Sequence, residues 1–141
     1  SAASDVYKRQ GYKSAELNNA EANERKNLLK IRCADLVQVT AFDAGKMTVN
    51  VKPLVKREIG DTVVSPPPIL GVKVANIPLE VEVEGKKGTV TVKINPGDIG
   101  VVVYLDLDSD NSIKTGAEST PNSSRVHSGD DAVFVGVVQK G

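Results

Sequence analysis

Residues 79–94 read LEVEVEGKKGTVTVKI, and this stretch gives the clearest indication of the fold class. Apolar and polar side chains alternate along residues 79–84 and again along 89–94, which is the period of a strand with one buried face. Residues 85–88 carry two glycines and are typical of a turn. The stretch therefore predicts an antiparallel hairpin with one face in water.

The chain after residue 31 contains further short strand-like segments separated by turns. Further strands are predicted over residues 36–42, 46–56, 71–76, 99–105 and 132–138. The run at 99–105, IGVVVYL, is almost continuously apolar, which is typical of a strand buried on both faces. Loops or turns are predicted at 43–45, 58–62, 95–98 and 106–128. Residues 65–70 contain three prolines, which cannot sit inside a sheet, and predict an extended surface segment.

About six short strands without a crossover helix predict an antiparallel barrel or sandwich. We expect an all-β fold: a small antiparallel β-barrel like the oligonucleotide/oligosaccharide-binding (OB) fold, preceded by an N-terminal α-helix. The helix is expected because residues 13–30 contain no Gly or Pro and are rich in good helix formers. Its apolar stripe is narrow, so it should be stable mainly when packed on something else, such as a neighbouring subunit.

Three segments are distinguished along the chain. Residues 1–10, SAASDVYKRQ, resemble the read-through translation of a transposase-type sequencing adapter, so they are interpreted as an assembly scar in a metagenomic gene model. The alternative is a natural polar tail. Residues 11–31 form the predicted N-terminal helix, and residues 32–141 form the OB-like β-barrel domain.

The composition argues against several classes of protein. Lys and Arg together number 18, as do Asp and Glu, so the formal net charge is zero, whereas nucleic-acid binders cluster positive charge. Charged residues at 26% and hydrophobic residues at 40% indicate a globular chain. Cys33 is the single cysteine, so an intrachain disulfide is impossible and synthesis in a reducing cytoplasm is expected. We interpret Cys33 as a small buried hydrophobe.

Four segments carry a family resemblance through their order and spacing. They are LVQVTAFDAGKMTVNVKPLVK at 36–56, SPPPILGVKV at 65–74, INPGDIGVVVYLDLDSD at 94–110 and SSRVHSGDDAVFVGV at 123–137. Together they resemble the N-terminal OB domain of the membrane-puncturing central spikes of contractile-tail phage baseplates. The similarity covers most of residues 27–138.

The resemblance implies a role. Such domains form homotrimers on the tail axis and link the spike to other hub and tube proteins, while a needle or tip perforates the target envelope. It implies a structural, non-enzymatic protein of the virion baseplate, made in the bacterial cytoplasm. Two departures stand out: the sequence stops at Gly141 without needle repeats, and His127 is its only histidine, so the His-x-His iron motif of needle tips is missing. Either the gene model is truncated, or a separate protein supplies the tip.

The acidic run after the 99–105 strand raises the question of a metal. Asp106, Asp108 and Asp110 with Asn111 partly match a calcium loop of the D-x-D-x-[DN] type. The EF-hand pattern, however, requires Gly where Asn111 stands and an acidic ligand where Ala117 stands. A solvated turn is the favoured interpretation, and neither a metal site nor a cofactor site is predicted.

The segment around His127 contains residue types that could form a catalytic site. Candidate partners are Ser123, Ser124, Arg125, Ser128, Asp130 and Asp131. Catalysis would need a nucleophile and an orienting group in a recognisable frame, and no G-x-S-x-G surrounds these serines. We expect Arg125 and His127 to hold the loop to the barrel or to a neighbouring subunit, and we predict no catalytic residues. A metal held by three copies of His127 on a trimer axis is the minor alternative.

An alternative function is an independent OB-type module that binds oligosaccharide or single-stranded nucleic acid. Basic residues that could form a patch are Lys52, Lys56, Arg57, Lys86 and Lys87. Such sites also need aromatic stacking platforms. The aromatics of the barrel region are Phe42, Tyr104 and Phe134, and the last two lie in apolar runs typical of a core. The sequence therefore favours the structural role, with no nucleic-acid partner.

Overall fold

The computed structural model describes residues 15–25, 27–28 and 31–140. The chain divides into two compact units, Ser1–Arg32 and Cys33–Gly141. In the first unit, residues 15–25 and 27–28 are helical, which confirms the predicted N-terminal helix. Residues 1–10, interpreted as an assembly scar, lie outside the described residues. Within the described ranges, no helix has the length and apolar character to cross a membrane.

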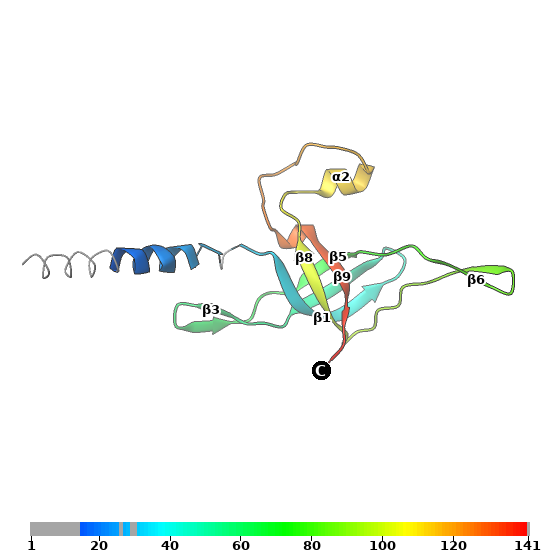
Figure 1. Cartoon of the computed structure of the whole chain (residues 1–141), viewed down its shortest axis with the longest axis horizontal. Coiled ribbons are helices and arrows are strands. Elements are labelled where there is room, and N and C mark those ends of the chain that lie inside the picture. Colours follow the sequence, from blue (N-terminus) through cyan, green and yellow to red (C-terminus); the bar gives the residue numbers. More distant parts are fainter. Residues whose placement is uncertain (1–14, 26, 29–30, 141) are drawn as a thin grey trace, which may run out of the picture. The chain divides into compact units, whose positions relative to one another are not determined.

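The second unit is built on a closed five-stranded barrel (Figure 1). Its strands are β1 (Ala34–Asp43), β2 (Thr48–Pro53), β5 (Ile69–Val74), β8 (Ile99–Tyr104) and β9 (Ala132–Val138). They follow one another around the barrel in the order β1-β2-β5-β9-β8, and β8 pairs back onto β1. The pairs are antiparallel except β5–β9, which is parallel. This confirms the predicted all-β, OB-like barrel.

The barrel interior is filled mainly by valines, because every second residue of each strand points inward. The buried apolar side chains are Val37, Val39, Val49, Val51, Val72, Ile94, Val102, Tyr104, Ala132 and Phe134. Phe134 is fully buried and is the largest of the completely enclosed side chains. The prediction that Tyr104 and Phe134 belong to the core is confirmed.

Two hairpins extend from the barrel (Figure 1). One consists of β3 (Arg57–Ile59) and β4 (Thr62–Val64), and the other of β6 (Glu80–Val83) and β7 (Lys86–Thr89). The prediction of a plain loop at 58–62 is wrong, because Gly60, with a φ of 63°, makes a tight turn between β3 and β4. The described residues form nine strands where about six were expected. The three-residue strands β3 and β4 are too short to show a sequence period.

The β6–β7 hairpin confirms the most distinctive sequence prediction but corrects its register. Glu84 and Gly85 have φ values of 52° and 78°, and two positive φ angles make the two-residue turn whose twist suits a hairpin. The predicted turn at 85–88 is therefore wrong, and β7 begins at Lys86. The second strand expected at 89–94 is also wrong: Ile94 instead joins the barrel core.

Strand β8 is buried on one face only, whereas the sequence predicts burial on both faces. Gly100, Val102 and Tyr104 point inward and are buried, but the alternate residues are only half-buried. Burial on both faces, which the continuous apolar run at 99–105 predicts, is therefore wrong for the isolated chain. This outer face of β8 enters the functional argument below.

Candidate functional site

The connection between β8 and β9 is a folded segment with its own contacts. Its two ends lie antiparallel, since Leu107 and Val126 form a β-bridge and the His127 N–H donates to the Asp106 carbonyl at 3.3 Å. The prediction of a plain loop over 106–128 is wrong, because α2 (Asp110–Thr115) lies within it. A short 3-10 turn, η1 (Gly129–Asp131), then leads into β9. The pairing of the two ends brings Asp108 and Arg125 together.

Arg125 is the centre of an ion network that joins this segment to the barrel. Its Nε donates to Asp131 Oδ2 at 2.8 Å, and its Nη2 donates to Asp131 Oδ1 at 3.0 Å. Nη2 also donates to Asp108 Oδ1 and to Asp110 Oδ2, both at 2.9 Å. The side chains of Asp108 and Asp131 are 1% and 0% exposed. Since Asp131 directly precedes β9, the network ties the segment to a barrel strand.

Further hydrogen bonds support the two buried carboxylates. The Ser123 hydroxyl donates to Asp108 Oδ2 at 2.8 Å, and the Ser109 N–H donates to Asp131 Oδ1 at 3.1 Å. The Ser123 hydrogen bond lowers the pKa of Asp108 below its ordinary value, although burial opposes the shift. The Arg125 hydrogen bond likewise lowers the pKa of Asp131. The hydrogen bonds of Arg125 to Asp131 and, to a smaller extent, to Asp110 raise the pKa of its guanidinium.

The structure does not bring together the three aspartates of the possible calcium loop, Asp106, Asp108 and Asp110. Asp106 has an 87% exposed side chain, faces the His127 ring and is not part of the cluster that contains Asp108 and Asp110. Asp131, which the sequence pattern did not include, joins the latter two, and their carboxylate oxygens lie within 4.8 Å of one another. Arg125 bonds to all three and supplies the positive charge that the hypothesis assigned to a metal ion. The solvated-turn interpretation is also wrong for Asp108, which is buried.

The His127 segment has structural contacts. The His127 backbone has a φ of 45°, its Nε2 lies 3.7 Å from Asp106 Oδ1, and its buried Nδ1 has no hydrogen-bond partner. The nearby serines are engaged elsewhere: Ser123 bonds Asp108, and the Ser128 hydroxyl accepts the Asp130 N–H at 3.2 Å. In the described part of the chain, no serine hydroxyl bonds the His127 ring. The expectation that Arg125 fastens this loop to the barrel agrees with these contacts.

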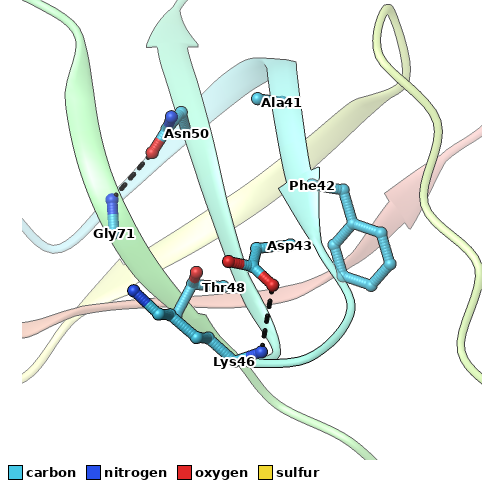
Figure 2. Close-up of a pocket in the computed structure, with 7 residues that line it drawn as sticks. All are labelled: Ala41, Phe42, Asp43, Lys46, Thr48, Asn50 and Gly71. Atoms are coloured by element: carbon cyan, nitrogen blue, oxygen red, sulfur yellow. Dashed lines mark hydrogen bonds between the residues drawn. The ribbon is translucent and has the colours of Figure 1, made fainter.

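A pocket of about 360 Å³ lies on the polar side of the barrel (Figure 2). It is lined by Ala41, Phe42, Asp43, Lys46, Thr48, Asn50 and Gly71. Its polar groups already serve the fold: Asn50 Oδ1 accepts the Gly71 N–H at 2.9 Å, and Asp43 Oδ1 accepts the Lys46 N–H at 3.1 Å. The Phe42 ring points away from these polar side chains in Figure 2 and packs against the core. The aromatic residue of the pocket, Phe42, is thus half-buried against the core, which leaves little stacking surface for a sugar or a base.

The other residues singled out by the sequence are dispersed. Arg57 Nη2 lies 3.9 Å from Asp35 Oδ2, and Lys87 Nζ lies 3.9 Å from Glu80 Oε1. Two of the five basic residues, Arg57 and Lys87, thus lie beside acids, which argues against the basic stripe of a nucleic-acid binder. Cys33 is exposed, so its interpretation as a buried hydrophobe is wrong.

Comparison with known families decides the relationship of the barrel. The family model for the phage protein Gp138 N-terminal domain matches residues 37–136. This chain belongs to that family. It is therefore a phage structural protein, in keeping with its small β-barrel. No curated protein matches the chain.

The match to the Gp138 N-terminal domain family spans most of the barrel unit. It runs from β1 to β9 and includes both hairpins and the whole Arg125 network. The ion network and the hairpins are thus part of the segment that defines the family relationship, and they are the features from which a role can be argued.

The ion network of this Gp138-family domain predicts a loss of stability in acid. Both Asp108 and Asp131 have lowered pKa values when folded, so near and below pH 4 the unfolded chain binds more protons. The stabilisation is present above about pH 4 and decreases as the pH falls through the folded pKa values. Urea unfolding measured from pH 7 to pH 3 should show this decline, and Asp108→Asn should make it shallower. If the free energy of unfolding falls with pH equally steeply in the wild type and in Asp108→Asn, Asp108 is not a source of the acid sensitivity.

Proposed function

We propose that this domain is a structural, non-enzymatic module of a phage-type contractile tail that works as a homotrimer. It would form part of the central spike or hub and connect the tail tube to a separate tip that punctures the cell envelope. Family membership supports a phage structural role. The observation that carries the trimer is an apolar outer face on the barrel, described next.

The outer surface of β1, β8 and β9 is apolar along three rows that cross the strands. The rows are Ala34–Val103–Val133, Leu36–Val101–Gly136 and Gln38–Ile99–Val138. Gln38 is the only polar side chain among these nine positions. Leu36 is 38% exposed and Val138 is 43% exposed, while the three β8 side chains are half-buried. We call this surface the β1–β8–β9 face.

The opposite side of the barrel provides the contrast. The outward residues of β2 and β5 include Thr48, Asn50, Lys52 and Lys73, which are suited to water, and one apolar residue, Leu70, which is 72% exposed. A barrel that is polar on one side and apolar on the other is expected when the apolar side is covered by another chain. The continuous apolar run at 99–105 fits this reading, because assembly would bury β8 on its second face.

The N-terminal helix supports assembly independently. Leu17 is 59% exposed and Leu28 is 67% exposed, so the described residues of this unit leave its narrow apolar stripe open. A helix with such a stripe is stabilised mainly by packing on a partner. Three copies around the tail axis would supply that partner. Other hub and tube proteins, the baseplate of the virion and synthesis in the bacterial cytoplasm remain part of the proposal by analogy with the spike family.

The alternative, an OB-type module for oligosaccharide or single-stranded nucleic acid, has less support. Tyr104 and Phe134 are 4% and 0% exposed, so neither can stack on a ligand. Phe42 packs against the core. It is the one aromatic residue among those that line the pocket in Figure 2. A salt-dependent titration with single-stranded DNA should therefore show no binding.

Light scattering after size exclusion tests the proposal. The wild-type chain should have three times its mass of 14.9 kDa. Leu36→Lys places a charge in the β1–β8–β9 face and should release folded single chains, whereas Lys52→Glu on the polar side should keep the trimer. A wild-type protein that is a single chain at micromolar concentration would overturn the proposal.

A further inference from the structure

The β6–β7 hairpin carries a second apolar surface that its own chain leaves open. Its strand register puts Val81 opposite Gly88 and Val83 opposite Lys86, and the Val90 N–H donates to the Leu79 carbonyl at 3.4 Å. Leu79, Val81, Val83 and Val90 therefore share one face, with exposed fractions of 57%, 43%, 63% and 46%. Gly88 lies on the same face, and so does Lys86, which adds one charge at the end of the face nearest the turn. The reverse face carries Glu80, Glu82, Lys87 and Thr89. We call the first surface the hairpin face.

A two-stranded hairpin with an open apolar face is only marginally stable in water. All eight residues of β6 and β7 are exposed, so the barrel of the same chain does not cover them. The hairpin of the same chain does not pack on the β1–β8–β9 face either, because all of its own residues are exposed. Each surface thus needs cover that its own chain does not provide.

Two glycines make the surfaces fit each other. Gly88 lies beside Val81 in the hairpin face, and Gly136 lies beside Val101 in the β1–β8–β9 face. Neither has a positive φ. A Cβ at Gly136 would meet nothing within 4 Å, and one at Gly88 would meet only the Val81 carbonyl at 3.9 Å. The fold of a single chain therefore does not require glycine at either place, although glycine weakens a strand.

Close approach of another surface explains both glycines, since glycine in a strand often marks such an approach. The two faces also agree in size. Each extends over four residue steps, or about 13 Å along the strands, and spans two or three strands spaced about 4.8 Å apart. Val81 of one face can thus enter the gap at Gly136 while Val101 enters the gap at Gly88.

We propose that the hairpin face of one copy packs on the β1–β8–β9 face of the next copy of this chain. This inference rests on the proposed function and names its interface. A second copy is the occupant because each chain carries both complementary surfaces once. Such a head-to-tail contact between identical chains closes into a ring of three when each copy is rotated by a third of a turn from the one before, and every hairpin and every barrel face is then covered.

Disulfide trapping between differently tagged chains tests the contact. Both chains carry Cys33→Ser, because Cys33 is an exposed free thiol. One also carries Val81→Cys and the other Gly136→Cys, and they are co-expressed and oxidised. We expect a mixed dimer band that disappears on reduction, since a disulfide requires Cα atoms within about 7 Å. Thr89→Cys, on the reverse face of the hairpin, should give no mixed band with Gly136→Cys.

A second pair of variants tests whether the hairpin face is needed for the trimer, with the mass in solution as the measurement. Val81→Lys should leave the circular dichroism spectrum unchanged but reduce the light-scattering mass to that of one chain, while Glu82→Lys on the reverse face should not. A wild-type trimer without the Val81–Gly136 cross-link, or a trimer that survives Val81→Lys, would overturn this interface and leave the trimer proposal standing. A wild-type single chain would overturn the proposed function itself.

Discussion

Arg125→Ala is expected to lower the melting temperature by about 10 °C or more. The guanidinium is the common partner of three carboxylates, two of which have side chains that are 1% and 0% exposed. Its removal leaves Asp108 and Asp131 buried, like-charged and without their cation, which is far more costly than losing an exposed pair. The segment between β8 and β9 should then detach from the barrel. Differential scanning calorimetry measures the change.

Matched variants separate the network from a general loss of charge. Arg125→Lys keeps one positive charge but cannot bridge the carboxylates with a planar fork, so an intermediate decrease is expected. Lys87→Ala removes the ion pair with Glu80, in which both side chains are more than half exposed, and should change the melting temperature by about 1 °C at most. An Arg125→Ala protein that melts like the wild type would contradict the structural role of the network.

Gly100→Ala is expected to destabilise the barrel by about 3 kcal/mol, at the upper end of the range for overpacking. A Cβ on this inward-facing residue of β8 would collide with Cε2 and Cζ of the Phe134 ring and with the Gly136 carbonyl oxygen. Phe134 is fully buried, so its ring has no free space to enter. Urea unfolding should show a lower midpoint with an unchanged slope.

The double variant Gly100→Ala/Phe134→Leu tests this cause. A smaller side chain at 134 should accept part of the added methyl group, so the double variant should lose less stability than the sum of the two single losses. Gly45→Ala is the control, because its Cβ would meet only Asp43 Oδ1 at 3.4 Å and its φ is not positive. Strict additivity would show that contact with the Phe134 ring is not what excludes a side chain at 100.

The sequence predicts the barrel well because inward and outward positions alternate in long strands. It fails where turns set the register. Glu84 at a positive φ is not a residue that signals a two-residue turn, so the more obvious glycine pair at 85–88 misplaces the second strand. The β3–β4 hairpin has three-residue strands and exposed side chains, and therefore leaves no period to detect.

The sequence predicts only part of the ion network. Arg125 and Asp131 stand six residues apart, so a contact between them can be expected, but the sequence pattern groups Asp108 with its neighbours Asp106 and Asp110. Its true partner lies 17 residues away and is reached only because Leu107 pairs with Val126. The apolar run at 99–105 predicts a strand that is buried on both faces. The single chain buries only one face of β8, and the proposed assembly would bury the other.

A three-dimensional reconstruction of the purified wild-type particle by electron cryomicroscopy tests the central claim most directly. The account predicts three copies around one axis, with the β1–β8–β9 face of every barrel buried between neighbouring chains. Isolated barrels, or an assembly in which Leu36, Val101 and Val138 face water, would contradict it.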